Sequence, residues 1–229
     1  MSQRESPKYR VSLRASTPPV SFNAIERPKS CFVGVSWENP NFNIKYIPSI
    51  MDWVKANFDN CSLIIADYLY RYSLMILNDL SEEEASKIAL EKGEKIYIEY
   101  KTAFDADPQI VIYRWLDKEV KINHDYLLQF DKTVRSNKSV MEVIDSDSQA
   151  YLDGKTFKST ISDDERLELC RKYIIEEMAF INYQAELGIN CSVYPGTQLS
   201  VLKNFSLNKF PECNLALSKV FYLDLAVKK

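Results

Sequence analysis

The stretch CFVGVS at residues 31–36 is a short apolar run that ends abruptly at the polar sequence WENPN. Its β-branched and aromatic residues are typical of a buried parallel strand. Apolar residues then recur at helical spacing from Ile47 to Phe58, which predicts a helix of about fifteen residues. A second apolar run, SLIIAD, follows at 62–67. The order strand, helix, strand predicts a right-handed βαβ unit and therefore a parallel sheet.

The rest of the chain continues this alternation. A capping box at Ser81 opens a predicted long helix, QIVIYRW at 109–115 predicts a third strand, and residues 123–145 predict another helix. The polar segment from residue 146 predicts a loop before a helix over 163–187, and CSVYP and KVFYLDLAV supply two further strands. The sequence therefore predicts an α/β fold, a Rossmann-like parallel sheet with helices on both faces.

Length and charge predict one folded domain preceded by an arm. The 229 residues are enough for a single core, which we expect to comprise residues 30–229. Residues 1–29 hold six Lys or Arg against two Glu, with little apolar periodicity, which predicts a loose basic arm. No apolar run is long enough to span a bilayer and no secretory signal is present, so we expect a cytoplasmic protein without a membrane partner.

Several kinds of site are disfavoured by what the sequence lacks. Five cysteines without a C-x-x-C pair and a single histidine, His124, argue against a metal site or a disulfide framework. Cys31 and Cys61 are interpreted as small buried hydrophobes. Neither G-x-G-x-x-G nor G-x-x-x-x-G-K-[ST] occurs, which disfavours a nucleotide cofactor.

Ser36 is the first candidate for chemistry because it follows the first predicted strand. In open α/β sheets the ligand crevice lies at the carboxyl ends of the strands. Gly34 and Phe32 share a face with Ser36, so Gly34 should leave space beneath the hydroxyl and Phe32 should line the same cavity. On its own, a serine at a strand end is more often a hydrogen-bonding cap than a nucleophile.

Tyr173 and Glu177 stand four residues apart on an apolar helix face, and no basic residue lies three or four positions from Glu177. Glu176, by contrast, has Lys172 four residues before it. Glu177 therefore needs a structural Lys or Arg from elsewhere or a cationic ligand, and helical spacing alone favours the structural partner. Tyr194 ends the strand-like run CSVY before Pro195, either as a phenol in the crevice or as a tyrosine at the edge of the core.

These residues together resemble the cyclodipeptide synthases, over most of the chain from about residue 30. The family motif [LVI]-G-[LVI]-S is matched by residues 33–36, with Asn39 in the loop beyond. The motif Y-[LVI]-x-x-E is matched by residues 173–177, and the tyrosine after the next strand is matched by Tyr194. The resemblance implies a Rossmann-type fold similar to the catalytic domains of class I tyrosyl- and tryptophanyl-tRNA synthetases.

Three positions depart from the family motifs. Ser30 stands where a histidine heads the first motif, Ala179 stands where a proline closes the second, and Pro195 follows Tyr194 in place of a histidine. The Tyr-Pro form resembles the family's second subfamily, whereas Asn39 is more typical of the first.

The resemblance implies an aminoacyltransferase that uses two aminoacyl-tRNAs in sequence to form a cyclic dipeptide, without ATP or another cofactor. Ser36 would accept the first aminoacyl group, because its hydroxyl exchanges one activated ester for another at little thermodynamic cost. A second aminoacyl-tRNA would then react, and the dipeptidyl ester would cyclise by attack of its own amine. Glu177 and Tyr173 would hold the substrate's α-ammonium group, and Tyr194 would relay a proton.

The resemblance also implies where the substrates bind. The residues expected to contact the amino acids are Phe32, Gly34, Asn39, Ile64 and Phe180. The family holds the first tRNA on a basic helix, which corresponds here to the helix with Lys87, Lys92 and Lys95. Three glutamates on that helix dilute its charge, so a solvated mixed-charge face is an equal alternative. The arm, Arg114 and Lys118 are further candidates for a salt-sensitive tRNA contact.

Two other functions are compatible with parts of the sequence. A serine hydrolase would use Ser36 with His124, although the G-x-S-x-G elbow and a second histidine are missing. A non-catalytic tRNA-binding module would need only the lysine-bearing helix.

Overall fold

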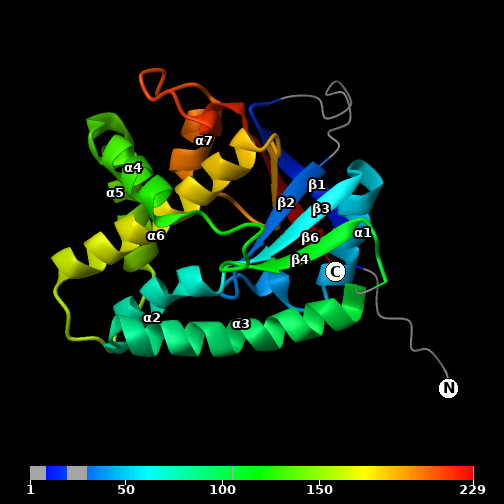
Figure 1. Ribbon diagram of the computed structural model, residues 1–229, viewed down its shortest axis with the longest axis horizontal. Coiled ribbons are helices and arrows are strands. Elements are labelled where there is room, and N and C mark those ends of the chain that lie inside the picture. Colours follow the sequence, from blue (N-terminus) through cyan, green and yellow to red (C-terminus); the bar gives the residue numbers. More distant parts are fainter. Residues whose placement is uncertain (1–8, 20–29, 105, 229) are drawn as a thin grey trace.

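The computed structural model describes residues 9–19, 30–104 and 106–228, which are arranged around one sheet (Figure 1). The strands of this part are β1 (Arg10–Thr17), β2 (Ser30–Val35), β3 (Asn60–Ile65), β4 (Ile110–Arg114), β5 (Cys191–Tyr194) and β6 (Phe221–Lys228). Their spatial order is β1-β6-β5-β2-β3-β4, and all described pairings are parallel except that of β1 with β6. The predicted α/β fold with a mostly parallel sheet is confirmed.

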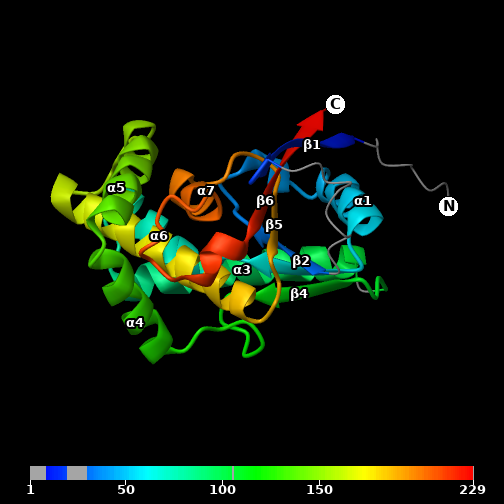
Figure 2. The ribbon, with the colours of Figure 1, turned by 90° about the horizontal axis from the view of Figure 1, so that it is seen from above.

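Helices cover both faces of the sheet because side chains alternate between the faces along each strand. The helices α1 (Ile47–Asn57) and α3 (Glu82–Phe104) pack over Val33 and Val35, whereas α6 (Asp163–Glu186) and α7 (Ser200–Ser206) pack over Phe32 and Ile64. Figure 2 shows α6, α7, α4 (His124–Arg135) and α5 (Lys138–Asp153) on one side of the sheet and α1 on the other. No helix in the described ranges combines the length and hydrophobicity needed to cross a bilayer.

The strand order reverses between β2 and β5. The chain proceeds from β2 outward through β3 and β4, whereas β5 and β6 lie on the other side of β2. Such a switch point opens a crevice at the carboxyl ends of the strands. Ser36 directly follows β2, and Tyr194 is the last residue of β5. The topology therefore places both candidate residues beside one crevice.

The N-terminal segment differs from the prediction. Arg10–Thr17 form the edge strand β1, paired with β6, and Val11 and Leu13 pack against the core on the α1 side. The prediction of a loose arm is therefore wrong for these residues. The rest of the predicted arm, apart from residues 9, 18 and 19, lies outside the described residues.

The helical boundaries also differ from the prediction. The helix predicted over 123–145 is two helices, α4 and α5, because Asn137 is the N-cap of α5. Its side chain accepts the Val140 N–H in the first turn of that helix. Helix α5 continues to Asp153, so the loop predicted from residue 146 is helical in its first part. Two short helices, α2 (Arg71–Asn78) and α7, were not predicted.

Candidate active site

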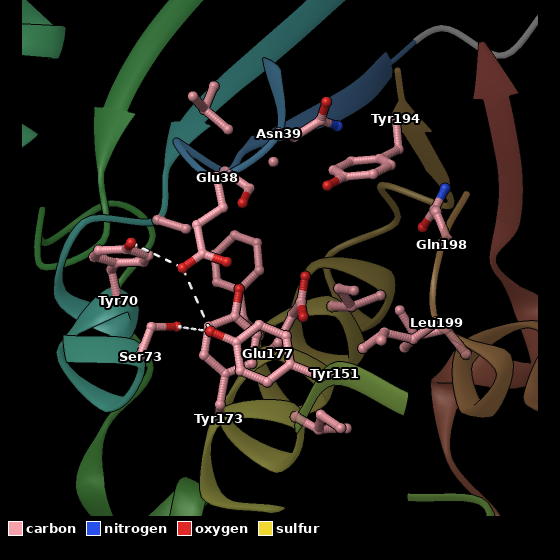
Figure 3. Close-up of a pocket in the computed structure, with 18 of the residues that line it drawn as sticks. Glu38, Asn39, Tyr70, Ser73, Tyr151, Tyr173, Glu177, Tyr194, Gln198 and Leu199 are labelled. Carbon is pink, nitrogen blue, oxygen red and sulfur yellow. Dashed lines mark hydrogen bonds between the residues drawn. The ribbon is translucent and has the colours of Figure 1, made fainter. Parts of the chain in front are cut away.

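A cavity of about 340 Å³ opens at the carboxyl ends of β2 and β5 (Figure 3). The predicted catalytic residues Ser36, Tyr173, Glu177 and Tyr194 all line it. So do all of the predicted substrate-binding residues, Phe32, Gly34, Asn39, Ile64 and Phe180. The fold thus brings together side chains from strands, a helix and loops that are far apart in the sequence.

Ser36 lies over open space, as its sequence neighbours predict. A Cβ atom added at Gly34 would meet no atom within 4 Å, so this glycine keeps the floor beneath the serine empty. Gly34 pairs with Ile64 of β3, whose side chain is fully buried and forms part of the same wall. A substrate group attached to Ser36 therefore has room to extend below the strand ends.

Aromatic rings form the wall next to this space. The ring of Phe180 on α6 lies 6.0 Å from that of Phe32, edge to face, and 4.6 Å from that of Trp115. Trp115, which directly follows β4, also lines the cavity and was not predicted as a site residue. This part of the cavity is suited to an apolar side chain.

Tyr173 and Glu177 project into the cavity from consecutive turns of α6 (Figure 3). Glu177 is half-buried, and its carboxylate makes no hydrogen bond or ion pair with any described residue. Burial raises the pKa of Glu177 to about 7. Burial, followed by the charge of Glu177, raises the pKa of Tyr173 well above its usual value. The unpaired carboxylate is therefore ready to bind a cation from outside the protein.

The neighbouring Glu176 has a different role from the one its spacing suggested. It is buried and accepts hydrogen bonds from Arg71 (2.7 Å), Trp115 Nε1 (3.0 Å) and Tyr72 (3.1 Å). Lys172, the partner expected from the sequence, is exposed, so that assignment is wrong. The buried network fixes α6 against α2 and explains why two adjacent glutamates differ: one is structurally paired and the other faces the cavity.

Hydrogen bonds join the loop after β2 to the loop after β5, next to Tyr194. The amides of Asn39 and Asn41 both donate to the carbonyl of Pro195, at 2.8 Å and 2.9 Å. Gly196 has a φ of 156°, and a Cβ there would lie 3.1 Å from the Tyr194 ring. Burial raises the pKa of Tyr194, while hydrogen bonding with Asn39 and Ser36 opposes the rise. The Tyr194 phenol therefore stays protonated at neutral pH, beside the Ser36 hydroxyl.

A further set of polar residues, not predicted from the sequence, lines the side of the cavity next to α2 and α5. Glu38 accepts hydrogen bonds from Tyr70 (2.9 Å) and Tyr151 (3.4 Å), and from the Lys155 ammonium (2.7 Å). Tyr151 in turn lies 3.2 Å from the Ser73 hydroxyl (Figure 3). These residues come from three stretches of the chain, at 38, 70–73 and 151–155, so no local spacing relates Glu38 to its partners.

The candidate tRNA contacts do not all remain available in the structure. Lys87, Lys92 and Lys95 are exposed on α3, and the Lys92 ammonium lies 4.4 Å from the centre of the Trp37 ring, next to Ser36. Arg114 is not a free cation, because it binds the carboxylates of Asp67 and Glu94 and the carbonyl of Leu90.

The single histidine is not placed to assist Ser36. His124 is exposed at the start of α4 and does not line the cavity, so it cannot serve as a base for Ser36. The five cysteines are free and buried, which confirms the interpretation of Cys31 and Cys61 as packing residues. In the described parts of the chain, no group of three or more His, Cys, Asp or Glu is arranged to hold a metal ion.

The departures from the family motifs have local explanations. Ser30 begins β2, about 20 Å along the strand from Ser36, and so lies far from the cavity. Ala179 is fully buried inside α6, where a proline would remove a helical hydrogen bond. Pro195 contributes its carbonyl to the loop contact with Asn39 and Asn41.

The fold resembles that of an aminoacyl-tRNA synthetase. It is similar to the tyrosyl-tRNA synthetase of Archaeoglobus fulgidus complexed with L-tyrosine, with a TM-score of 0.52 and 16% identity over 87% of this chain and 55% of that one. A family model described as cyclodipeptide synthase matches residues 19–205. The chain therefore belongs to the cyclodipeptide synthase family, aminoacyltransferases that form cyclic dipeptides from aminoacyl-tRNA.

Solved structures with this fold share little sequence with the chain. A cyclodipeptide synthase from Fluoribacter dumoffii has a TM-score of 0.77 and 19% identity, over 96% of this chain and 98% of that one. A second, from Candidatus Glomeribacter gigasporarum bound to Phe-tRNAPhe, has a TM-score of 0.65 and 20% identity, over 88% and 90%. A comparison with curated protein sequences finds no match.

Proposed function

We propose that this chain joins two aminoacyl groups by ping-pong transfer through an acyl ester on Ser36 and a dipeptidyl ester on the same residue. One observation carries the proposal: Ser36 and the unpaired carboxylate of Glu177 line one cavity at the switch point of the sheet. A serine able to carry an acyl group and a carboxylate able to hold an ammonium group are what an α-amino ester requires.

In the first transfer, Ser36 Oγ attacks the ester carbonyl of the first aminoacyl-tRNA. The bond from the carbonyl carbon to the terminal ribose oxygen breaks, and that oxygen takes up the serine proton. One ester replaces another, so no ATP is consumed. Glu177 binds the α-ammonium group together with the hydroxyl of Tyr173, and the apolar wall at Phe32 and Phe180 receives the side chain.

The α-ammonium group of the amino acid on Ser36 must lose a proton before its nitrogen can attack a second ester. Glu177 suits this step, because burial brings its pKa to about 7. The freed amine attacks the ester carbonyl of the second aminoacyl-tRNA, and the bond from that carbon to the ribose oxygen breaks. The ribose oxygen takes up the proton that the nitrogen loses, the second tRNA leaves, and the dipeptide remains on Ser36. Its new terminal amine then attacks the Ser36 ester, the bond from the carbonyl carbon to Ser36 Oγ breaks, and Tyr194 gives its phenolic proton to Ser36 Oγ and regains one from the attacking amine. The cyclic dipeptide is released and the serine is regenerated.

The tRNA is proposed to bind along α3 through Lys87, Lys92 and Lys95. Lys92 supports this orientation because its ammonium lies against Trp37, the residue after Ser36. A relative of this fold is bound to Phe-tRNAPhe. The Tyr194-Pro195 pair further suggests that the chain belongs to the Tyr-Pro subfamily.

Incubation with a full set of charged tRNAs, followed by mass spectrometry for cyclic dipeptides, tests the proposal. The wild-type protein should form product and Ser36→Ala should form none. Turnover of simple esters without tRNA would instead favour a hydrolase, and tRNA binding without any product would favour a binding module. Product formed by Ser36→Ala at the wild-type rate would contradict the role of Ser36.

A further inference from the structure

The cavity has a second part with a different chemical character from the aromatic wall. We call it the polar lobe and define it by Glu38, Ser73, Ser148 and Tyr151, which line the cavity from the loop after β2 and from α2 and α5. The opposite part, at Phe32, Ile64 and Phe180, presents only hydrocarbon and aromatic surface. Side chains of two substrates bound in this cavity would therefore meet different walls.

Ser148 gives the strongest indication that the polar lobe receives a ligand. Its side chain is fully buried and lines the cavity, yet its hydroxyl has no hydrogen-bond partner among the described residues. Leaving a buried hydroxyl unpaired is unfavourable, by about 1–3 kcal/mol. An alanine of nearly the same size would avoid this loss. The hydroxyl is accounted for if a polar substrate group completes its hydrogen bond.

The charged groups in and beside the lobe already have hydrogen-bond partners, and their charges restrict which side chains the lobe can accept. Tyr70, Tyr151 and Lys155 donate to the Glu38 carboxylate, and Asp147 accepts the Val201 N–H at 2.9 Å. These two carboxylates repel an acidic side chain, and the carboxylate of Glu38 is already paired with Lys155, so it offers no free partner to a basic side chain. An uncharged side chain with a hydroxyl or amide group fits the lobe.

We propose that the polar lobe selects the second amino acid, and that this amino acid carries an uncharged hydroxyl or amide side chain. The inference rests on the proposed function, in which the first side chain occupies the aromatic wall. The products are then mixed cyclic dipeptides with one apolar and one polar residue. Ser148 is the specificity-determining residue, because its hydroxyl is the unpaired hydrogen-bonding group of the lobe among the described residues.

Competition between matched substrates tests this inference. Equimolar tRNAs charged with threonine and valine, asparagine and leucine, or tyrosine and phenylalanine are supplied, and the cyclic products are quantified by mass spectrometry. In the wild type, the polar member of at least one pair should be incorporated about tenfold or more over its apolar match. Ser148→Ala should lower that ratio about tenfold. Because it removes an unpaired hydroxyl, the variant should fold as well as the wild type, which thermal unfolding verifies.

Phe32→Leu serves as the matched control in the aromatic wall. It should change which apolar residue is incorporated and leave the polar-to-apolar ratio of the second residue unchanged. Wild-type products made only of apolar residues, or an unchanged ratio in Ser148→Ala, would overturn the inference while leaving the proposed function intact. If no charged tRNA set gives a cyclic dipeptide, the proposed function itself fails.

Discussion

Glu177 is the residue whose environment is hardest to explain without a substrate. Burial raises its pKa to about 7, so the folded protein binds an extra proton between the ordinary carboxyl pKa near 4.3 and about 7. Folding stability therefore falls as the pH rises through this window and levels off above it. At neutral pH the carboxylate thus reduces stability, which is typical of a group retained for function.

The same pKa predicts a pH dependence of activity. Below about pH 7 Glu177 becomes neutral and can no longer hold the α-ammonium group, so kcat/KM for the first aminoacyl-tRNA should rise about twentyfold from pH 5.5 to 7.5. Glu177→Gln should lose most of its activity and show no such rise. The measurement is a series of initial rates across this pH range.

Glu142→Gln provides a control for this prediction, since Glu142 is exposed on α5 beside Lys138. Its pH profile should coincide with that of the wild type. A Glu177→Gln profile that still rises as in the wild type would show that another group controls ammonium binding.

The sequence identified the residues that follow strand ends and share a helix face, because those relations are local. Ser36, Tyr173, Glu177 and Tyr194 are of this kind, and the cavity includes all four. Glu38 could not be found in this way, because its partners Tyr70, Tyr151 and Lys155 come from other segments. The pairing of Glu176 was mistaken for the same reason: Arg71 lies 105 positions away.

At the scale of elements, the buried contact between Glu176 and Arg71 joins α6 to α2 and so holds the wall that carries Tyr173 and Glu177. Glu176→Gln would remove the buried counter-charge of Arg71 and leave it only the exposed carboxylate of Glu82 at 3.4 Å, and should lower the free energy of unfolding by about 3–5 kcal/mol. Urea unfolding gives this value directly.

The exposed pair of Lys138 and Glu142 again offers the comparison, because Glu142→Gln there should change stability by less than about 0.5 kcal/mol. The double variant Arg71→Met/Glu176→Met should lose less free energy of unfolding than the single variants Arg71→Met and Glu176→Met lose together. Equal effects of Glu176→Gln and Glu142→Gln would mean that the buried network does not stabilise the helix pair.

Helix α3 carries the proposed tRNA contact. Changing Lys87, Lys92 and Lys95 to glutamine should raise KM for aminoacyl-tRNA about tenfold or more and flatten its dependence on salt, since fewer counterions are released on binding. Steady-state kinetics at several salt concentrations measure both effects. Thermal unfolding should be unchanged, because all three side chains are exposed.

A matched triple variant separates position from charge. Lys132, Lys209 and Lys219 are exposed and lie outside α3, so their replacement by glutamine removes the same net charge elsewhere. It should leave KM nearly unchanged. An equal loss in both triple variants would indicate a contact spread over the surface rather than one on α3.

Helix α5 shows why some elements escaped prediction. Its buried residues Val140, Ile144, Ser148 and Leu152 recur every four positions, but the serine interrupts the apolar pattern. The polar composition from residue 146 onward then indicated a loop. The residue that hid the helix is thus the one placed in the polar lobe. Strand β1 was missed for a similar reason, since RVSLRAST mixes charged and small polar residues, as edge strands do.

At the scale of the whole molecule, β1 makes the N-terminal segment part of the folded domain. Leu13 packs against the core on the α1 side, while the neighbouring Arg14 is exposed. Leu13→Asp should therefore lower the free energy of unfolding by about 2 kcal/mol, whereas Arg14→Asp should change it by less than about 0.5 kcal/mol. Urea unfolding of the two variants compares them, and equal stabilities would contradict the docking of β1.

The strand order places Ser36, which follows β2, beside Tyr194 of β5 and opposite α6, in the position that acyl transfer through Ser36 requires. The most direct test mixes the protein in excess with one aminoacyl-tRNA, quenches in acid and determines the intact mass. We predict an increase of one aminoacyl residue, located on the peptide that contains Ser36 and absent in Ser36→Ala. No adduct on the wild type, or the same adduct on Ser36→Ala, would contradict the account.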